Sequence, residues 1–234
     1  MDNTTNQLSQ QVTKSYIKIF LIRFFMLPVL LGILIFLPAR TFNYWQLYVY
    51  GVILVLPMVI GFSYFLKNDP QLMERRSRPK EKEKAQVFIQ TAFAILIISG
   101  YVISGLDKHN AWSNIPFHIV LIADLFLLLG YTIIFLVFKQ NSFASNIVEV
   151  DSNQKVISTG LYKWVRHPMY VGLILLIIPT PIALGSYWAL IPVVAIPFTL
   201  VLRILNEENV LRKQLPGYSE YCQKTKFRLI PFIW

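Results

Sequence analysis

The sequence predicts an all-α, polytopic integral membrane protein with about six transmembrane helices. Its composition is 55% hydrophobic and 15% charged, with a mean hydropathy of +0.53, whereas ordinary soluble domains are roughly 45–50% apolar and about 25% charged. Several apolar runs also approach the length of about 20 residues at which a helix crosses a bilayer. Both observations favour a membrane protein over a soluble one.

The formal charge of +10 fits a membrane protein with basic cytoplasmic flanks better than a nucleic-acid-binding protein, because the apolar excess is so large. We therefore expect membrane lipids as partners and no nucleic acid. A single cysteine, Cys222, excludes an internal disulfide and a multi-cysteine metal site. His109, His118 and His167 are too scattered to suggest a metal ligand set, so no metal is expected.

The first part of the chain predicts a polar cytoplasmic N-terminus over residues 1–18, followed by a four-helix transmembrane region over residues 19–138. The four expected spans cover about residues 19–37, 45–66, 87–106 and 117–138. The loop from Lys67 to Lys84 is rich in Lys and Arg and is assigned to the cytoplasm by the positive-inside rule. Attraction to lipid headgroups is the alternative role of its charges.

Asp124 lies within the fourth expected span. An intramembrane carboxylate suggests a functional site, because burying a charge in lipid is expensive. Two interpretations stay open: structural pairing or a position near the outer boundary, and a role with a substrate or a proton.

Residues 139–234 predict a region with two further spans and a cytoplasmic tail. The loop over 140–163 contains a short β-like segment at 155–158. The fifth span covers about 168–183 and is interrupted by Pro179 and Pro181, while the sixth covers about 187–205 and forms a hairpin with it. An amphipathic tail over 206–234 is expected to return to the interface. An even number of spans places both termini in the cytoplasm.

Polar and aromatic side chains gather at the mouth of the fifth span, from Gly160 to Gly172. Pro168 is suited to the first position of a helix, which places His167 near its N-cap. The free N–H groups there favour an anionic group, and Gly172 permits close approach of a backbone or a flat ring. Membrane anchoring by an interfacial aromatic belt is the alternative interpretation.

A second polar cluster follows the sixth span. Arg203 and Glu207 are spaced i, i+4, so a continuing helix would present them on one face, and Glu208 would point elsewhere. A salt bridge at the helix end is the simpler interpretation. Because both clusters are expected on the cytoplasmic side of one hairpin, the sequence predicts a shared cytoplasmic pocket. The sequence contains neither a phosphate-binding P-loop nor a dinucleotide-binding motif.

These residues resemble the C-terminal signature of the isoprenylcysteine carboxyl methyltransferase family, which is related to phospholipid N-methyltransferases. The shared pattern is Gly160-x-Tyr162-x-x-x-Arg166-His167-Pro168-x-Tyr170-x-Gly172, then Glu207-Glu208-x-x-Leu211 and Gly217-x-x-x-Tyr221. The likeness covers roughly the last 90 residues. Leu161, where bacterial members often have Pro, and Glu149, near a Gln of some relatives, depart from it.

The resemblance implies a membrane-embedded methyltransferase that depends on S-adenosylmethionine. It assigns cofactor contacts to Gln154, Lys155, Val156, Ile157, Tyr162, His167, Pro168, Met169, Tyr170 and Glu207. It places Arg203 at the substrate, and Glu207 or Glu208 becomes the candidate base if the acceptor is an amine. Methyl transfer from a sulfonium is an in-line displacement that needs alignment and exclusion of water.

The acceptor is expected to be lipophilic, either the carboxylate of an isoprenyl-type substrate or a lipid amine. A carboxylate is already ionised at neutral pH, so Arg203 would orient it and no base would be required. Two other classes stay open at this point. One is a membrane NADPH-dependent reductase of sterol or isoprenoid type, and the other is a non-enzymatic transporter or scaffold in which Asp124 and the charged loops act.

Overall fold

The computed structural model describes residues 22, 26, 29–77, 84–145, 147, 150–151 and 153–234. The regular structure of this part is helical, as predicted. A first helix covers Val29–Ala39. The others are α2 (Trp45–Asn68), α3 (Pro70–Ser77), α4 (Lys84–Asn110), α5 (Phe117–Gln140), the 3-10 helix η1 (Gly160–Lys163), α6 (Pro168–Ile177), α7 (Thr180–Ala183), α8 (Leu190–Val193), α9 (Ile196–Gln214) and α10 (Tyr218–Lys224). The polar N-terminus predicted over 1–18, and Glu149, lie outside the described residues.

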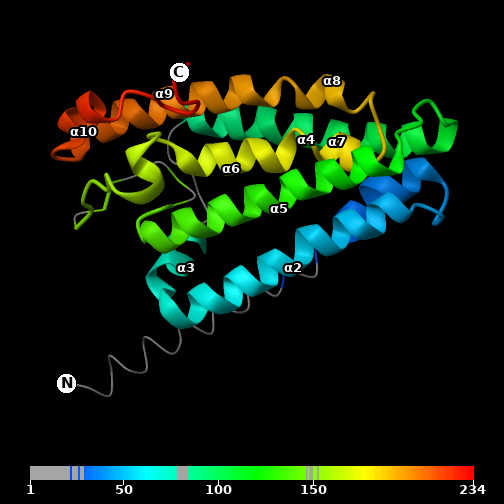
Figure 1. Cartoon of the computed structure of the whole chain (residues 1–234), viewed down its shortest axis with the longest axis horizontal. Coiled ribbons are helices and arrows are strands. Elements are labelled where there is room, and N and C mark those ends of the chain that lie inside the picture. Colours follow the sequence, from blue (N-terminus) through cyan, green and yellow to red (C-terminus); the bar gives the residue numbers. More distant parts are fainter. Residues whose placement is uncertain are drawn as a thin grey trace.

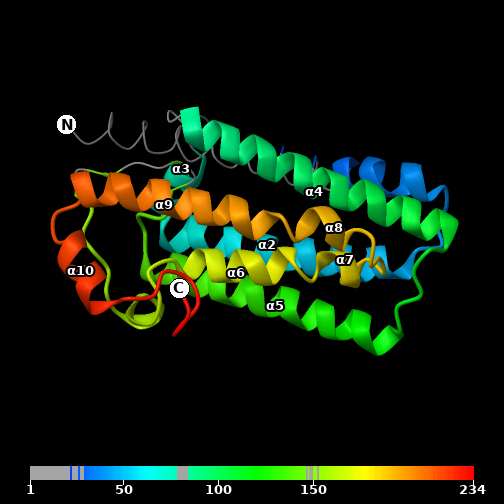
Figure 2. The same ribbon diagram turned by 90° about the horizontal axis from the view of Figure 1, so that it is seen from above.

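The long helices run side by side along the longest axis of the molecule (Figures 1 and 2). Helix α6 packs along α5, and α4 packs along α8 and α9. The short elements α3, η1 and α10 gather at one end of the bundle, and the turn before α2 and the link between α4 and α5 lie at the other (Figure 1). The polar residues of the predicted pocket therefore come from several elements at one end.

Four helices are long and apolar enough to cross a membrane: Trp45–Asn68, Ala85–Asn110, Phe117–Gln140 and Leu190–Gln214. The segments Val29–Ala39 and Pro168–Ala183 are apolar but shorter. Large apolar side chains such as Val52, Leu56 and Ile60 are more than half exposed and recur at helical spacing on α2. An apolar face of this kind suits lipid rather than water. The chain is an integral membrane protein with four candidate spans, and the predicted number of six is not confirmed.

Two glycines bring α5 and α6 into backbone contact. A Cβ on Gly130 would lie 2.7 Å from the carbonyl oxygen of Gly172, and one on Gly172 would lie 2.9 Å from that of Gly130. An added Cβ would clash at these distances, so the two backbones can approach this closely only because both positions are glycine. Membrane helices that associate through small residues pack in the same way. The close approach predicted at Gly172 is confirmed, and its partner is a backbone. It fixes the start of α6 against α5.

The prolines interrupt the C-terminal hairpin as expected. Helix α6 ends at Ile177 just before Pro179, and a two-residue break separates α8 from α9. Helix α9 continues to Gln214, past the predicted end of the sixth span at about 205, which agrees with the continuing helix expected for Arg203 and Glu207. Residues 206–215 contain neither proline nor glycine, and an i, i+4 contact of 3.7 Å joins Glu208 to Arg212. The segment 155–158 is not a strand and has no strand partner in the described part of the chain.

Two buried carboxylates, one on α4 and one on α5, differ in their partners. Asp107 is 1% exposed and accepts hydrogen bonds from the backbone N–H of Ser113 at 2.7 Å, from the Ser113 hydroxyl at 2.6 Å and from the Ser186 hydroxyl. Asp124 is 4% exposed, and neither of its carboxyl oxygens has a hydrogen-bond partner among the described residues. The structural pairing predicted as one role for Asp124 is therefore not found there.

This difference predicts opposite results for substitution by leucine. Asp124→Leu is expected to leave the unfolding temperature in detergent unchanged or to raise it, because it removes an uncompensated buried polar group. Asp107→Leu should destabilise the protein by about 1–3 kcal/mol, because the donors of Ser113 and Ser186 lose their acceptor. Thermal unfolding of both variants checks this. An equal fall in unfolding temperature for Asp124→Leu would show that its carboxyl group has a stabilising partner.

Candidate active site

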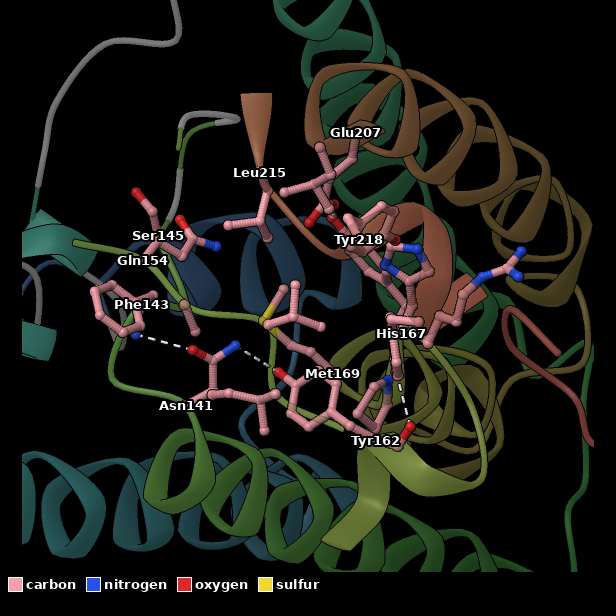
Figure 3. Close-up of a pocket in the computed structure, with 18 of the residues that line it drawn as sticks. Asn141, Phe143, Ser145, Gln154, Tyr162, His167, Met169, Glu207, Leu215 and Tyr218 are labelled. Atoms are coloured by element: carbon pink, nitrogen blue, oxygen red, sulfur yellow. Dashed lines mark hydrogen bonds between the residues drawn. The ribbon is translucent and has the colours of Figure 1, made fainter. Parts of the chain in front are cut away.

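A cleft opens at the end of the bundle where α6 begins and α9 ends. It is lined by Asn141, Phe143, Ala144, Ser145, Ile147, Gln154, Lys155, Val156, Ile157, Tyr162, Arg166, His167, Pro168, Met169, Tyr170, Arg203, Glu207, Leu211, Leu215, Tyr218 and Tyr221. The enclosed part of the cleft has a volume of about 110 Å³, and the cleft together with its open side has a volume of about 900 Å³. A larger ligand would therefore extend along the open side. Figure 3 shows Phe143, Ser145 and Gln154 across from Glu207 and Tyr218.

The start of α6 forms one wall of the cleft. His167 is its N-cap and Pro168 its first residue, as the sequence predicts. The backbone N–H of Arg166 donates to the carbonyl of Phe227, and that of His167 donates to the carbonyl of Arg228, both at 2.9 Å. The C-terminal tail thus packs directly beside this wall and holds its backbone in place.

Glu208 lies behind the wall rather than in the cleft, and its side chain is 3% exposed. Its carboxylate accepts from Arg166 Nε at 2.7 Å and from Arg228 Nε at 3.1 Å, and it lies 3.3 Å from His167 Nε2. Because cationic donors already occupy its lone pairs, Glu208 is a poor proton acceptor for a substrate. The geometry does not favour the catalytic role predicted for it. It fixes Arg166 and His167.

Tyr170 connects the two polar clusters predicted from the sequence. Its hydroxyl accepts from Arg203 Nε at 2.9 Å and donates to Glu207 Oε2 at 2.7 Å. Arg203 and Glu207 share one face of α9, as their spacing indicates, and the hydroxyl of Tyr170 from α6 bonds to both of them. The arrangement places a guanidinium and a carboxylate in the same cleft at fixed positions.

The loop after α5 forms the opposite wall. The side-chain amide of Asn141 donates to the Tyr162 hydroxyl at 2.8 Å, and its oxygen accepts from the backbone N–H of Phe143 at 2.9 Å (Figure 3). Burial raises the pKa of Tyr162 to about 12. The Tyr221 hydroxyl donates to the carbonyl of Tyr162 at 2.7 Å. Tyr162 is therefore a neutral hydrogen-bonding group held by the loop after α5 and by α10.

Two arginines of α3 hold the same loop from outside. Arg75 donates to the carbonyl of Ser142 at 2.8 Å and lies 3.4 Å from Asp151, and Arg76 donates to the carbonyl of Ser145 at 3.2 Å. The sequence assigned these charges to membrane orientation or to lipid headgroups. Their contacts give them an additional role in positioning a wall of the cleft. No short motif signals this role, because about 70 residues separate the partners.

Tyr218 is a cleft residue that the sequence prediction missed. It is 5% exposed, and its buried hydroxyl has no hydrogen-bond partner among the described residues. Burial raises its pKa, so the hydroxyl keeps its proton. Buried polar groups are normally satisfied, and an unsatisfied one requires an explanation. A polar atom of a bound molecule would satisfy this hydroxyl.

The ten residues predicted to contact the cofactor all line the cleft, and so does Arg203. Glu208 alone among the predicted site residues does not. Their chemical roles stay predictions. Within the described ranges, no group of three His, Cys, Asp or Glu side chains could hold a metal ion.

Residues 119–213 match the isoprenylcysteine carboxyl methyltransferase family. This segment runs from α5 into α9 and carries most of the cleft. A comparison with curated proteins finds no match. Among solved structures, the chain is similar to that of the eukaryotic intramembrane Ras methyltransferase (isoprenylcysteine carboxyl methyltransferase) without a monobody. The identity is 18% and the TM-score 0.53, covering 100% of this chain and 88% of that one, so the two share a fold.

Proposed function

We propose that this chain, whose residues 119–213 match the isoprenylcysteine carboxyl methyltransferase family, transfers a methyl group from S-adenosylmethionine to a lipophilic acceptor in the membrane. The observation that carries the proposal is the convergence of the α6 start, the α9 face and the loop after α5 on one cleft. That cleft lies at the end of an apolar bundle, where a water-soluble cofactor and a lipophilic acceptor can meet.

The lining of the cleft fits this cofactor. Glu207 supplies an anionic acceptor suited to hydroxyl or ammonium groups, and Tyr218 supplies the buried hydroxyl that has no partner among the described residues. Met169 and the apolar residues of the 154–157 segment offer surface for a flat ring. When bound, S-adenosylmethionine supplies an electrophilic methyl group, so the protein needs no nucleophile or metal of its own.

Arg203 is proposed to orient the acceptor. A guanidinium matches the geometry of a carboxylate, and Tyr170 holds Nε of Arg203 so that its direction is fixed. Orientation of this kind lowers a barrier by placing reacting atoms in line. The role of Tyr170 is to keep Arg203 and Glu207 at a constant separation.

A carboxylate acceptor agrees better with this site than an amine acceptor. Methylation of a protonated amine requires a base, but Glu208 is occupied by cations, and Glu207 accepts the hydroxyl hydrogen of Tyr170. An ionised carboxylate needs only a cation to orient it, which Arg203 supplies. We place the cleft and both termini in the cytoplasm, following the basic loop before α4, and we assign lateral entry from the membrane to the acceptor.

A methyl-transfer assay tests the proposal. Purified full-length chain in lipid would be incubated with radiolabelled S-adenosylmethionine and N-acetyl-S-farnesylcysteine. Label is expected in a base-labile ester of the farnesylated compound. N-acetyl-S-farnesylcysteine amide, which lacks the free carboxylate, is the matched control and should stay unlabelled. Failure of the folded protein to methylate the carboxylate, together with methylation of a lipid amine, would contradict the proposed acceptor class.

A further inference from the structure

A second cavity lies far from the cleft, between the first described helix and α4. Its volume is about 590 Å³, and it is lined by Ile33, Leu34, Leu37, Pro38, Arg40, Val102, Leu106 and His109. Gln86 of α4 donates to the carbonyl of Arg203, at the cleft end, and His109 follows 23 residues later, which corresponds to about 35 Å of helix. The cavity, a groove, therefore lies at the opposite end of the bundle from the cleft, where the ribbon shows the turn before α2 and the end of α4 (Figures 1 and 2).

The groove has a fixed shape because the two helices touch beside it. A Cβ on Gly105 would lie 2.5 Å from the carbonyl oxygen of Ile35 and 2.6 Å from Pro38. The helices thus meet backbone to backbone at Gly105, and the walls of the groove are the apolar side chains next to this contact. Leu37 and Ile33 are 76% and 56% exposed. Such walls are suited to an acyl chain.

The mouth of the groove carries the positive charge of Arg40. Among its described lining residues, only Arg40 and His109 are polar, both are exposed, and none is acidic. The nearest acid in the chain to His109, Asp107, is buried and engaged by Ser113 and Ser186. Lys108 is directed elsewhere, over the ring of Tyr44 at 5.4 Å. An anion at the mouth would therefore meet positive charge without a competing carboxylate.

Arg40 occupies a backbone conformation that arginine disfavours. Its φ is +52°, and its N–H donates to the carbonyl of Phe36 at 2.8 Å, closing the C-terminal turn of the helix. Glycine is the usual residue at this position because it adopts a left-handed conformation without strain. An arginine here costs stability that glycine would not.

We propose that this groove binds one anionic phospholipid, with an acyl chain along Leu34, Val102 and Leu106 and its phosphate at Arg40 and His109. Charge complementarity at the mouth selects the headgroup, and the apolar walls select a chain-bearing molecule over a free phosphate. The attraction of one Lys or Arg to an anionic membrane surface corresponds to about a fivefold change in a binding constant. The site is separate from the proposed methyl transfer and does not depend on it.

Lipid retention measured by native mass spectrometry tests this site. Full-length protein in neutral detergent would be titrated with phosphatidylglycerol, phosphatidylcholine or water-soluble glycerol phosphate. We expect one retained phosphatidylglycerol, preferred about fivefold over phosphatidylcholine, and no retained glycerol phosphate. Equal retention of the two phospholipids, or retention of glycerol phosphate alone, would overturn the proposal.

The variant Arg40→Gly separates lipid binding from folding. It should abolish the preference for phosphatidylglycerol, while the unfolding temperature without lipid stays equal or rises, because glycine relieves the positive φ. Ala111→Gly is the matched control, since Ala111 has the same φ of +52° but does not line the groove; it should keep the preference. A preference that survives Arg40→Gly would refute the assigned headgroup site.

A bulky substitution in the wall tests the acyl-chain part. Leu106→Trp should reduce retention of phosphatidylglycerol and phosphatidylcholine alike, because the indole would fill the groove. Ile122→Trp is its control, as Ile122 is an exposed apolar residue on α5, outside the groove. Unchanged retention in Leu106→Trp, with the protein folded, would show that the chain does not lie there.

Discussion

Glu208→Gln is expected to lower the stability of the protein more than any other single change in the site. The substitution keeps the shape of the side chain but removes the negative charge that faces Arg166 and Arg228. Arg166 is 7% exposed, so its guanidinium would be left as a buried charge without an anion. Breaking a buried pair in this way costs about 3–5 kcal/mol.

Thermal unfolding measures this effect. A loss of that size corresponds to a fall of roughly 6–20 °C in a protein of this length, together with weaker cofactor binding because the α6 wall loses its support. Glu220→Gln is the matched control: Glu220 is an exposed acid on α10, and such changes usually stay within about 0.5 kcal/mol. A Glu208→Gln variant as stable as the wild type, with only turnover reduced, would instead assign Glu208 to catalysis.

Arg203→Ala is expected to reduce turnover about 100-fold while changing the affinity for S-adenosylhomocysteine less than about threefold. The reason is that Arg203 is assigned to orienting the acceptor, and misplacing a reacting group by about 1 Å can lower the rate 10²-fold. Glu207→Ala should show the opposite pattern, in which the affinity for S-adenosylhomocysteine falls more than the turnover does. Steady-state kinetics and calorimetry on both variants separate the two roles.

Lys213→Ala provides the control for Arg203→Ala. It removes a cation from the exposed last turn of α9, outside the cleft lining, and should leave kcat unchanged. If Arg203→Ala lost cofactor affinity in proportion to its lost activity, the assignment of Arg203 to the acceptor would be wrong. Equal kcat values for Arg203→Ala and the wild type would remove it from the mechanism.

Local signals in the sequence were sufficient for the start of α6 and for the face of α9. Pro168 sets the helix start through its ring geometry, and the i, i+4 spacing of Arg203 and Glu207 follows from helical periodicity. The same periodicity correctly indicated that Glu208 points away from Glu207. Helix α9 continues beyond the apolar run to Gln214, because Glu, Leu, Arg and Gln are good helix formers.

The remaining parts of the site depend on contacts that no local pattern records. The loop after α5 is positioned by Arg75 and Arg76 of α3, and Tyr221 reaches the carbonyl of Tyr162 from α10. Nothing in the sequence distinguishes Tyr218 from other tyrosines of the C-terminal tail, whereas the fold buries its hydroxyl and places the residue in the lining of the cleft. Periodicity describes one helix at a time, so it could not bring these segments together.

Calorimetric titration of the folded, full-length protein with S-adenosylhomocysteine tests the central claim most directly, with Tyr218→Phe as the variant. We expect binding by the wild type and about 2- to 10-fold weaker binding by Tyr218→Phe, the loss expected for one hydrogen bond, with no loss of stability. Tyr187→Phe, an exposed tyrosine outside the cleft lining, should bind like the wild type. Absence of binding to folded wild-type protein, or equal affinity in Tyr218→Phe, would contradict the assignment of this cleft to the cofactor.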